Sequence, residues 1–139
     1  MCATPVSVGI TGVGQISIIV HDLGSATAFY RDALGLPLLF TAGNLAFFDC
    51  GGVRLMLGPA ETPELDHPSS ILYFRVPDIN AGYRRLVEAD VRVEGPPRLI
   101  APMPTYDLWM AAFHDSEGNL MQLMSEVPRT ARPYCAPSG

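Results

Sequence analysis

Two polar side chains lie in otherwise apolar stretches near the C-terminal end, where they could contact a bound molecule. His114 ends an apolar run and is followed by Asp115, which could orient or charge its imidazole ring. Gln122 places an uncharged amide on the face that a strand of period two shares with Leu120 and Met124. His114 is therefore the best candidate for acid–base chemistry, the alternative being that it touches no ligand.

A second group of candidates comes from two short stretches with alternating side chains earlier in the chain. Gln15 and Ser17 share one face of the first, and Arg54 and Met56 share one face of the second. Arg54 would suit a carboxylate or phosphate if its strand face lines a cavity. The alternative is a solvated arginine near a strand end.

Hydrophobic periodicity predicts strands alternating with two helices. Asp22 and Asp78 are expected to cap these helices, and Gly35 and Pro37 to end the first one. Turn residues separate the remaining apolar stretches. The predicted strands are 14–21, 38–41, 45–48, 53–57, 71–76, the stretches 91–93 and 98–100 on either side of a Gly-Pro-Pro break, 108–113 and 120–124.

The order of strand, helix and three strands occurs twice, which indicates an internal repeat. The sequence Val-His-Asp-Leu at 20–23 matches Val-Pro-Asp-Ile at 76–79. Two similar units indicate two sheets, each burying a helix on one face, with the opposite faces curling around a shared cavity. The predicted segments are an N-terminal lead-in (1–10), a first module (11–58), a linker (59–70), a second module (71–126) and a mobile C-terminal tail (127–139).

Composition excludes several classes of protein. The 139 residues are 48% hydrophobic and 17% charged, as expected for a packed domain, and the net charge of −5 comes without a basic run. We therefore expect no nucleic-acid partner and no membrane partner. Three cysteines without a CxxC pair favour a reduced, cytoplasmic location.

Two motifs resemble those of a known superfamily. The stretch DLGSATAFYRDALGLP at 22–37 is similar to the first-module signature of the vicinal-oxygen-chelate proteins, and 113–124 is similar to their second-module signature. That superfamily includes glyoxalase I, bleomycin-resistance proteins and extradiol dioxygenases. The resemblance covers roughly 12–125 and implies an α+β fold. In that fold, paired βαβββ modules form a curved, partly open mixed β-sheet barrel with two flanking helices.

The resemblance also places a metal site at the floor of the groove, with one ligand from each of four strands. The corresponding positions in this chain are Gln15, Met56, Ile71 and Gln122. Two amides, a thioether and a hydrocarbon supply no negative charge to a dication, so we expect no metal cofactor.

The resemblance therefore favours a small-molecule-binding protein, with bleomycin-resistance proteins as the nearest functional analogue and a homodimer as the expected assembly. An aromatic or amphipathic ligand would suit the groove. Whether the chain is an enzyme stays open. The alternatives are a lyase, isomerase or dioxygenase, with or without a metal, and a dimerising module with no ligand. The residues expected to contact a ligand are Gln15, Ser17, Arg54, Met56, Ile71, Tyr73, Met110, His114 and Gln122.

Overall fold

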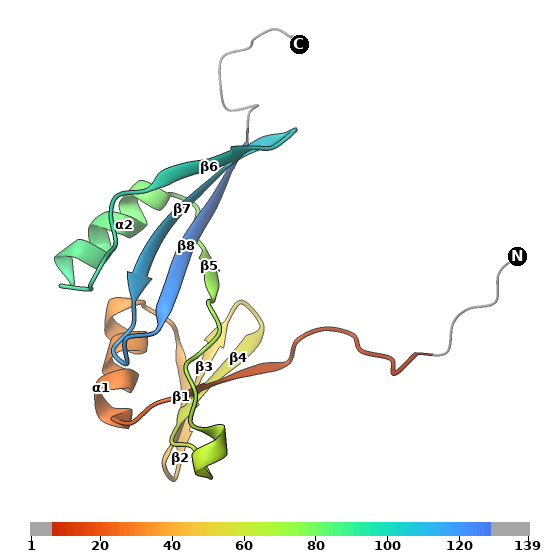
Figure 1. The fold of residues 1–139 in the computed structure, drawn as a ribbon, viewed down its shortest axis with the longest axis vertical. Coiled ribbons are helices and arrows are strands. Elements are labelled where there is room, and N and C mark those ends of the chain that lie inside the picture. Colours follow the sequence, from red (N-terminus) through yellow and green to blue (C-terminus); the bar gives the residue numbers. More distant parts are fainter. Residues whose placement is uncertain (1–6, 129–139) are drawn as a thin grey trace, which may run out of the picture.

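The computed structural model describes residues 7–128, which form two βαβββ modules (Figure 1). The first module contains β1 (Gln15–Ile19), α1 (Leu23–Ala28), the π-helical turn η1 (Phe29–Ala33), β2 (Leu38–Ala42), β3 (Leu45–Cys50) and β4 (Val53–Gly58). The second contains β5 (Tyr73–Arg75), α2 (Ile79–Glu88), β6 (Arg98–Pro102), β7 (Tyr106–His114) and β8 (Leu120–Pro128), after a 3₁₀ turn, η2 (Pro63–Leu65), in the linker.

Each module builds one four-stranded mixed sheet. The orders are β1-β4-β3-β2 and β5-β8-β7-β6, so the two halves share one topology. In each sheet the first strand runs parallel to the last, and the other pairs are antiparallel. The predicted α+β class and repeat are therefore confirmed, and the two sheets do not close into a barrel.

Both helices begin at the predicted aspartates. The Asp22 carboxylate accepts the Ser25 amide, and the Asp78 carboxylate accepts the amides of Asn80 and Ala81. These bonds satisfy amides that have no partner within the first helical turn. The first helix then widens into η1, which turns Tyr30 into the core.

The helices lie together on one side of the molecule and the sheets lie on the other (Figure 1). Alternate strand residues pack beneath the helices, including Ile18, Phe48, Leu55 and Phe113, all at most 1% exposed. One continuous cluster of buried side chains contains residues of both modules. The paired modules therefore share a single core.

A buried hydrogen bond joins the two modules. The Tyr30 hydroxyl in η1 donates to Asp115, 85 residues later, at 2.7 Å. Burial, together with the charge of Asp115, raises the pKa of the Tyr30 phenol and keeps it protonated as a donor. Asp115 also accepts two backbone amides and the Asn119 side chain, so it organises the β7–β8 turn.

The strand bounds differ from the predicted ones, most clearly at three places. Ile71 precedes β5, since the pairing with β8 starts only where the Gln122 amide donates to the Leu72 carbonyl oxygen, and further upstream the Ser69 amide bonds to the Asn119 side chain. The stretch 91–93 makes only an isolated bridge from Val93 to Phe113, since a glycine and two prolines follow it. β8 reaches Pro128, two residues past the predicted end of the second module. The rest of the predicted tail and residues 1–6 lie outside the described part of the chain.

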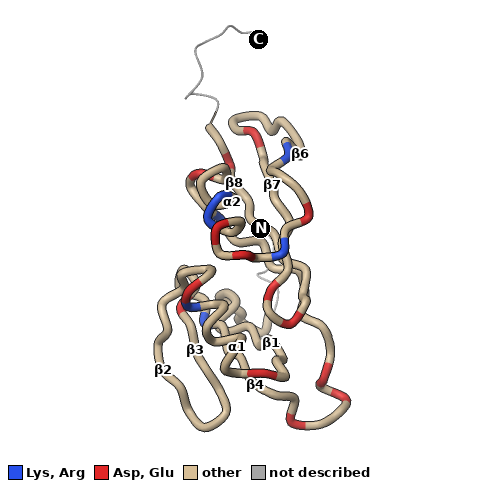
Figure 2. The backbone as a smooth tube through the Cα atoms, turned by 90° about the vertical axis from the view of Figure 1, so that its left-hand side faces the viewer, with Lys and Arg blue, Asp and Glu red and all other residues tan. Residues whose placement is uncertain are grey.

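Charged positions are spread over both modules, and Arg positions do not gather into one stretch of the backbone (Figure 2). No helix within residues 7–128 is long and apolar enough to cross a membrane.

Candidate functional site

The face of the first sheet that points away from α1 carries four of the predicted contact residues. β1 and β4 pair in the registers Gln15↔Arg54 and Ser17↔Met56. Because side chains directly opposite each other on paired strands point the same way, these four share one face. Gln15, Ser17 and Arg54 are exposed and Met56 is half-buried. The face is therefore open, whereas the sequence predicted that it would enclose a cavity.

A connected set of contacts fixes the polar part of this face. The Arg54 Nε donates to Gln15 Oε1 at 2.7 Å, and the Gln15 amide nitrogen lies 3.6 Å from the Met56 sulfur. The neutral Gln15 amide therefore contacts both the Arg54 guanidinium and the Met56 thioether.

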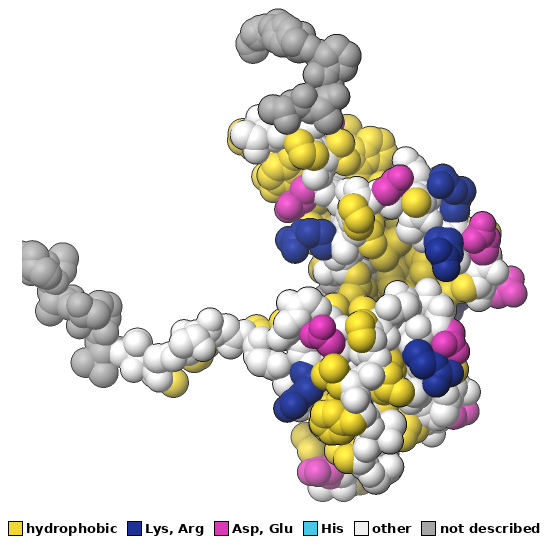
Figure 3. Space-filling view, turned by 180° about the vertical axis from the view of Figure 1, so that it is seen from behind, with side chains coloured by type: hydrophobic (Ala, Val, Ile, Leu, Met, Phe, Trp, Pro, Cys, Tyr) yellow, Lys and Arg dark blue, Asp and Glu magenta, His cyan; other side chains and the backbone are white. Residues whose placement is uncertain are grey.

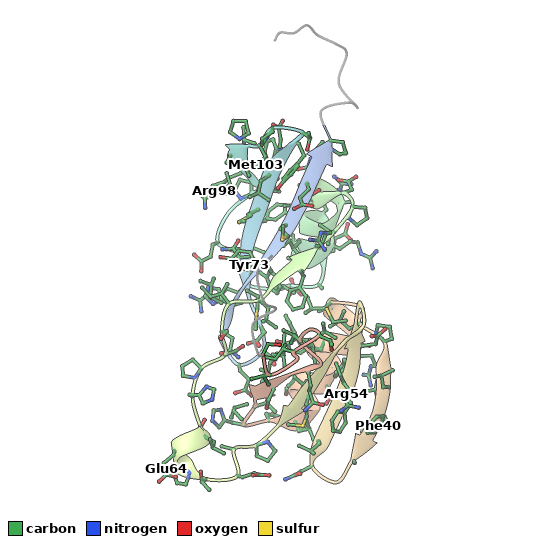
Figure 4. All side chains as sticks on the ribbon, turned by 90° about the vertical axis from the view of Figure 1, so that its right-hand side faces the viewer. Phe40, Arg54, Glu64, Tyr73, Arg98 and Met103 are labelled. Atoms are coloured by element: carbon green, nitrogen blue, oxygen red, sulfur yellow. The ribbon has the colours of Figure 1, made fainter. Side chains whose placement is uncertain are left out.

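Two aromatic rings, which the sequence reasoning missed, complete the open face of the first sheet. Phe47 on β3 lies opposite Met56, and Phe40 on β2 lies opposite Phe47. The Phe40 and Phe47 rings stack with centroids 4.5 Å apart, and the Arg54 guanidinium carbon lies 5.3 Å from the Phe47 centroid. Figure 4, viewed from the side away from the helices, shows Arg54 and Phe40 close together on the lower module. The predicted strands 45–48 and 53–57 form a hairpin, and pairing them across the turn would have placed Phe47 opposite Met56.

The second sheet presents its own open face. Tyr73 pairs with Gln122, which also lies opposite Ala112, and Met110 lies opposite Met124. Tyr73 is 49% exposed, whereas Met110 and Gln122 are half-buried. The structure thus brings Tyr73, Met110 and Gln122 onto one face, as their spacing suggested.

Ile71 departs from the expected site, whereas His114 keeps the expected face of β7 but makes other contacts than expected. Ile71 is 44% exposed and lies before β5, outside the strand ladder. The His114 ring has a partner on each nitrogen, namely the Glu94 carboxylate and, at 3.3 Å, the Gly118 carbonyl oxygen. Asp115, the expected partner of His114, points instead at Tyr30 and Asn119. His114 therefore ties β7 to the chain around Glu94 and does not present a free ring nitrogen.

The side chains at the family's metal positions are poor ligands for a divalent ion. Gln15 and Met56 hydrogen-bond to each other, and Ile71 has no donor atom. Dications of the kinds proteins hold at such sites need carboxylates, imidazoles or thiolates to offset dehydration. Within residues 7–128, no group of three or more His, Cys, Asp or Glu side chains is arranged so that it could hold a metal ion.

A second polar cluster, which the sequence did not indicate, lies where the modules and the linker meet. The His21 ring bonds to Glu117 through Nδ1 at 2.8 Å and to Asp66 through Nε2 at 3.0 Å. These hydrogen bonds, with the negative charges of Asp66 and Glu117, raise the pKa of His21. The cluster borders a cavity of about 310 Å³. Its members are 45 and 96 residues apart, and no local pattern links them.

The larger cavity, of about 650 Å³, is an apolar cleft between the modules, and Figure 3 shows apolar side chains in the recess there. It is lined from the first module by Ile16, Leu36 and Leu55, and from the second by Phe74 and Leu123. Cys50 also borders it, and burial, with the nearby Asp49 charge, raises the pKa of its thiol. A protonated thiol is a poor nucleophile, so this cleft offers no reactive cysteine.

Known proteins resemble this chain in sequence and in structure. Residues 12–123 match the family described as the Glyoxalase/Bleomycin resistance protein/Dioxygenase superfamily. The uncharacterized protein YraH of Bacillus subtilis (strain 168) is 28% identical over 123 residues, covering 78% of this chain and 94% of YraH.

Two solved structures extend the comparison. TnmS3, an antibiotic binding protein from Streptomyces sp. CB03234, is 26% identical with a TM-score of 0.68, over 86% of this chain and 99% of TnmS3. Lactoylglutathione lyase from Agrobacterium tumefaciens is 22% identical with a TM-score of 0.66, over 84% of this chain and 95% of the lyase, and shows the shared fold. Because the family match spans most of the sequence and agrees with the repeated βαβββ architecture, this chain belongs to the glyoxalase, bleomycin resistance protein and dioxygenase superfamily.

Proposed function

We propose that this protein binds a small aromatic or amphipathic molecule on its open sheet faces without a metal ion. The observation that carries the proposal is the contact set on the first sheet. There the amide of Gln15 joins Arg54 and Met56, and two stacked phenylalanines continue the surface. Apolar and aromatic side chains with a few fixed hydrogen-bonding groups are the usual lining of a ligand site. TnmS3 is an antibiotic binding protein, and its similarity to this chain supports the same type of function.

Binding fits the geometry better than an enzymatic function. A metal-free lyase or isomerase would need an acid–base group at the ligand, and His114, the best candidate from the sequence, has both ring nitrogens engaged. A metal-dependent enzyme would need anionic or imidazole ligands at the positions of Gln15, Met56, Ile71 and Gln122.

We further propose that the active assembly is a cytoplasmic homodimer in which a second copy covers the open faces. Phe40, Ile71 and Tyr73 are each 44–49% exposed, and covering such large apolar side chains would favour association. Light scattering should give twice the chain mass of 15.0 kDa. A monomer at micromolar concentration would exclude this assembly.

Elemental analysis and a thermal-shift screen test the binding function. Protein purified without chelators should contain no stoichiometric Zn, Ni, Fe or Mn, and aromatic antibiotics in the screen should raise the melting temperature. Gln122→Leu should weaken the response, while Asn80→Ala, on the exposed surface of α2, should leave it unchanged. A stoichiometric metal, or a screen with no stabilising compound, would overturn the proposal.

A further inference from the structure

Arg54 is held in place on an open surface without a carboxylate partner. Of the seven arginines within residues 7–128, Arg31, Arg75, Arg85 and Arg92 form ion pairs at 2.8–3.9 Å with acidic side chains, and Arg54, Arg84 and Arg98 do not; of these three, Arg54 has its guanidinium held by a side-chain hydrogen bond. Within residues 7–128, no acidic side chain forms an ion pair with Arg54, whose contacts are the neutral Gln15 and the ring of Phe47. Its positive charge is therefore not compensated by the fold.

The acidic side chain opposite Arg54 forms no ion pair with it. Asp49 lies opposite Arg54 in the β3–β4 pair, and its carboxylate accepts the Gly52 amide at 3.0 Å within the turn. Asp49 keeps its negative charge, but its carboxylate is not within ion-pair distance of the guanidinium, whose hydrogen bond goes to Gln15.

The contacts of Arg54 also leave part of its donor set available. Arginine has five N–H donors, and Nε is the one that bonds to Gln15. The terminal nitrogens remain for a planar anion, which guanidinium groups bind through two parallel hydrogen bonds. Because Gln15 and Phe47 already fix the side chain, a ligand would not have to order it on binding.

Apolar surface lies immediately beside this cation. Met56, Phe47 and Phe40 form one row across β4, β3 and β2, next to the row that contains Arg54. Phe40 is 46% exposed and Met56 half-buried, so an aromatic ring has surface to contact on these two side chains, whereas Phe47 between them is 8% exposed and supports Phe40 from below; methionine sulfur also contacts aromatic rings favourably.

We infer that the ligand of this site is an aromatic compound carrying a carboxylate, with the carboxylate on Arg54 and the ring on the Met56–Phe47–Phe40 row. This inference rests on the proposed binding function and specifies the class of ligand. The Arg54–Gln15 pair then replaces a metal ion as the group that fixes the oxygen atoms of the ligand.

A matched pair of probes tests the inference. Calorimetry should show that 2-naphthoate binds at least about tenfold more tightly than its neutral isostere 2-naphthamide, since a hydrogen bond to a charged group contributes about that much. Arg54→Gln should reduce the ratio of the two dissociation constants to about one, mainly by weakening naphthoate. Arg84→Gln, on the exposed surface of α2, is the matched control and should keep the ratio.

The outcomes separate this inference from the function on which it rests. If both probes bind equally to the unmodified protein, or if Arg54→Gln keeps the preference, the aromatic-binding function stands and the role of Arg54 is wrong. If neither probe binds, the aromatic-binding function fails and the inference falls with it. If Arg54→Gln does not fold, raising the salt concentration should weaken naphthoate alone in the unmodified protein. An equal effect on both probes contradicts the inference.

Discussion

At the scale of single residues, His21 makes the contacts that depend most clearly on pH. Its ring bonds to a carboxylate at each nitrogen, and only the doubly protonated imidazolium can donate to both. The same Glu117 carboxylate accepts the backbone amides of His21 and Asp22, so the cluster also holds the chain at the start of α1.

We predict that the His21 cluster stabilises the protein most at mildly acidic pH. The folded protein raises the pKa of His21 above its ordinary value of about 6.5. The stabilisation is therefore fully present below about pH 6.5 and is lost as the pH rises through the higher folded value. The free energy of unfolding, measured by urea titration from about pH 6 to about pH 8.5, should fall, and His21→Gln should flatten the decline.

His67 provides the matched control for that experiment. Its ring bonds to the carbonyl oxygen of the adjacent Pro68 at 3.0 Å and not to a carboxylate. His67→Gln should therefore keep the slope of the unmodified protein. A slope that His21→Gln leaves intact would show that another group causes the pH dependence.

At the scale of structural elements, the β3–β4 and β7–β8 turns occupy equivalent places in the repeat but differ in the number of hydrogen bonds that hold them. Asp49 opens the β3–β4 turn and accepts one amide, from Gly52. Asp115, at the matching position of the β7–β8 turn, is 6% exposed and accepts four hydrogen bonds, one of them from Tyr30 in the other module.

We predict that the two equivalent aspartates differ strongly in their effect on stability. Asp115→Ala leaves several buried donors without an acceptor and should lower the free energy of unfolding by about 3 kcal/mol or more. Asp49→Ala removes one partly exposed hydrogen bond and should cost about 1 kcal/mol. Urea denaturation of both variants measures the difference. Equal losses would mean that the bond between the modules adds nothing to the turn.

Most elements could be predicted from the sequence because their signals are local. Helix caps at Asp22 and Asp78, glycine turns and strand alternation all depend on near neighbours in the chain. The prediction was wrong at Ile71, where the Ser69 amide bonds to Asn119 from fifty residues away. It also could not anticipate η1, since nothing in the pattern of 29–33 distinguishes a π-helical turn from an α-helical one.

The candidate site was predictable to a similar extent. Strand parity placed Gln15, Ser17, Arg54 and Met56 on one face, because alternation follows from backbone geometry alone. Parity does not give the partner of a side chain across the sheet, so the stacking of Phe40 on Phe47 was missed. For His114, adjacency in sequence suggested Asp115, but neighbours along a strand point to opposite faces and Glu94 is the partner.

At the scale of the whole molecule, both sheets leave one face uncovered while the helices and the modules share a single core. Because most large apolar residues pack in the core shared by the two modules, few remain to enclose a groove within one chain. The exposed Phe40 and Tyr73 on the uncovered faces are the reason why the binding site and the proposed dimer should be studied together.

The hydrogen bond from Tyr30 to Asp115 and the shared core should keep the two modules associated even when the linker between them is cut. Because noncovalent contacts hold the halves together, a protease cut introduced between Ala60 and Glu61 should yield two pieces that still co-elute in gel filtration. Each piece alone would expose a large apolar surface and should aggregate or stay unfolded. Pieces that elute separately while still folded would mean that the modules are self-sufficient. Co-elution of the cut pieces would mean that the contact between the two modules matters more for the fold than an unbroken backbone between them.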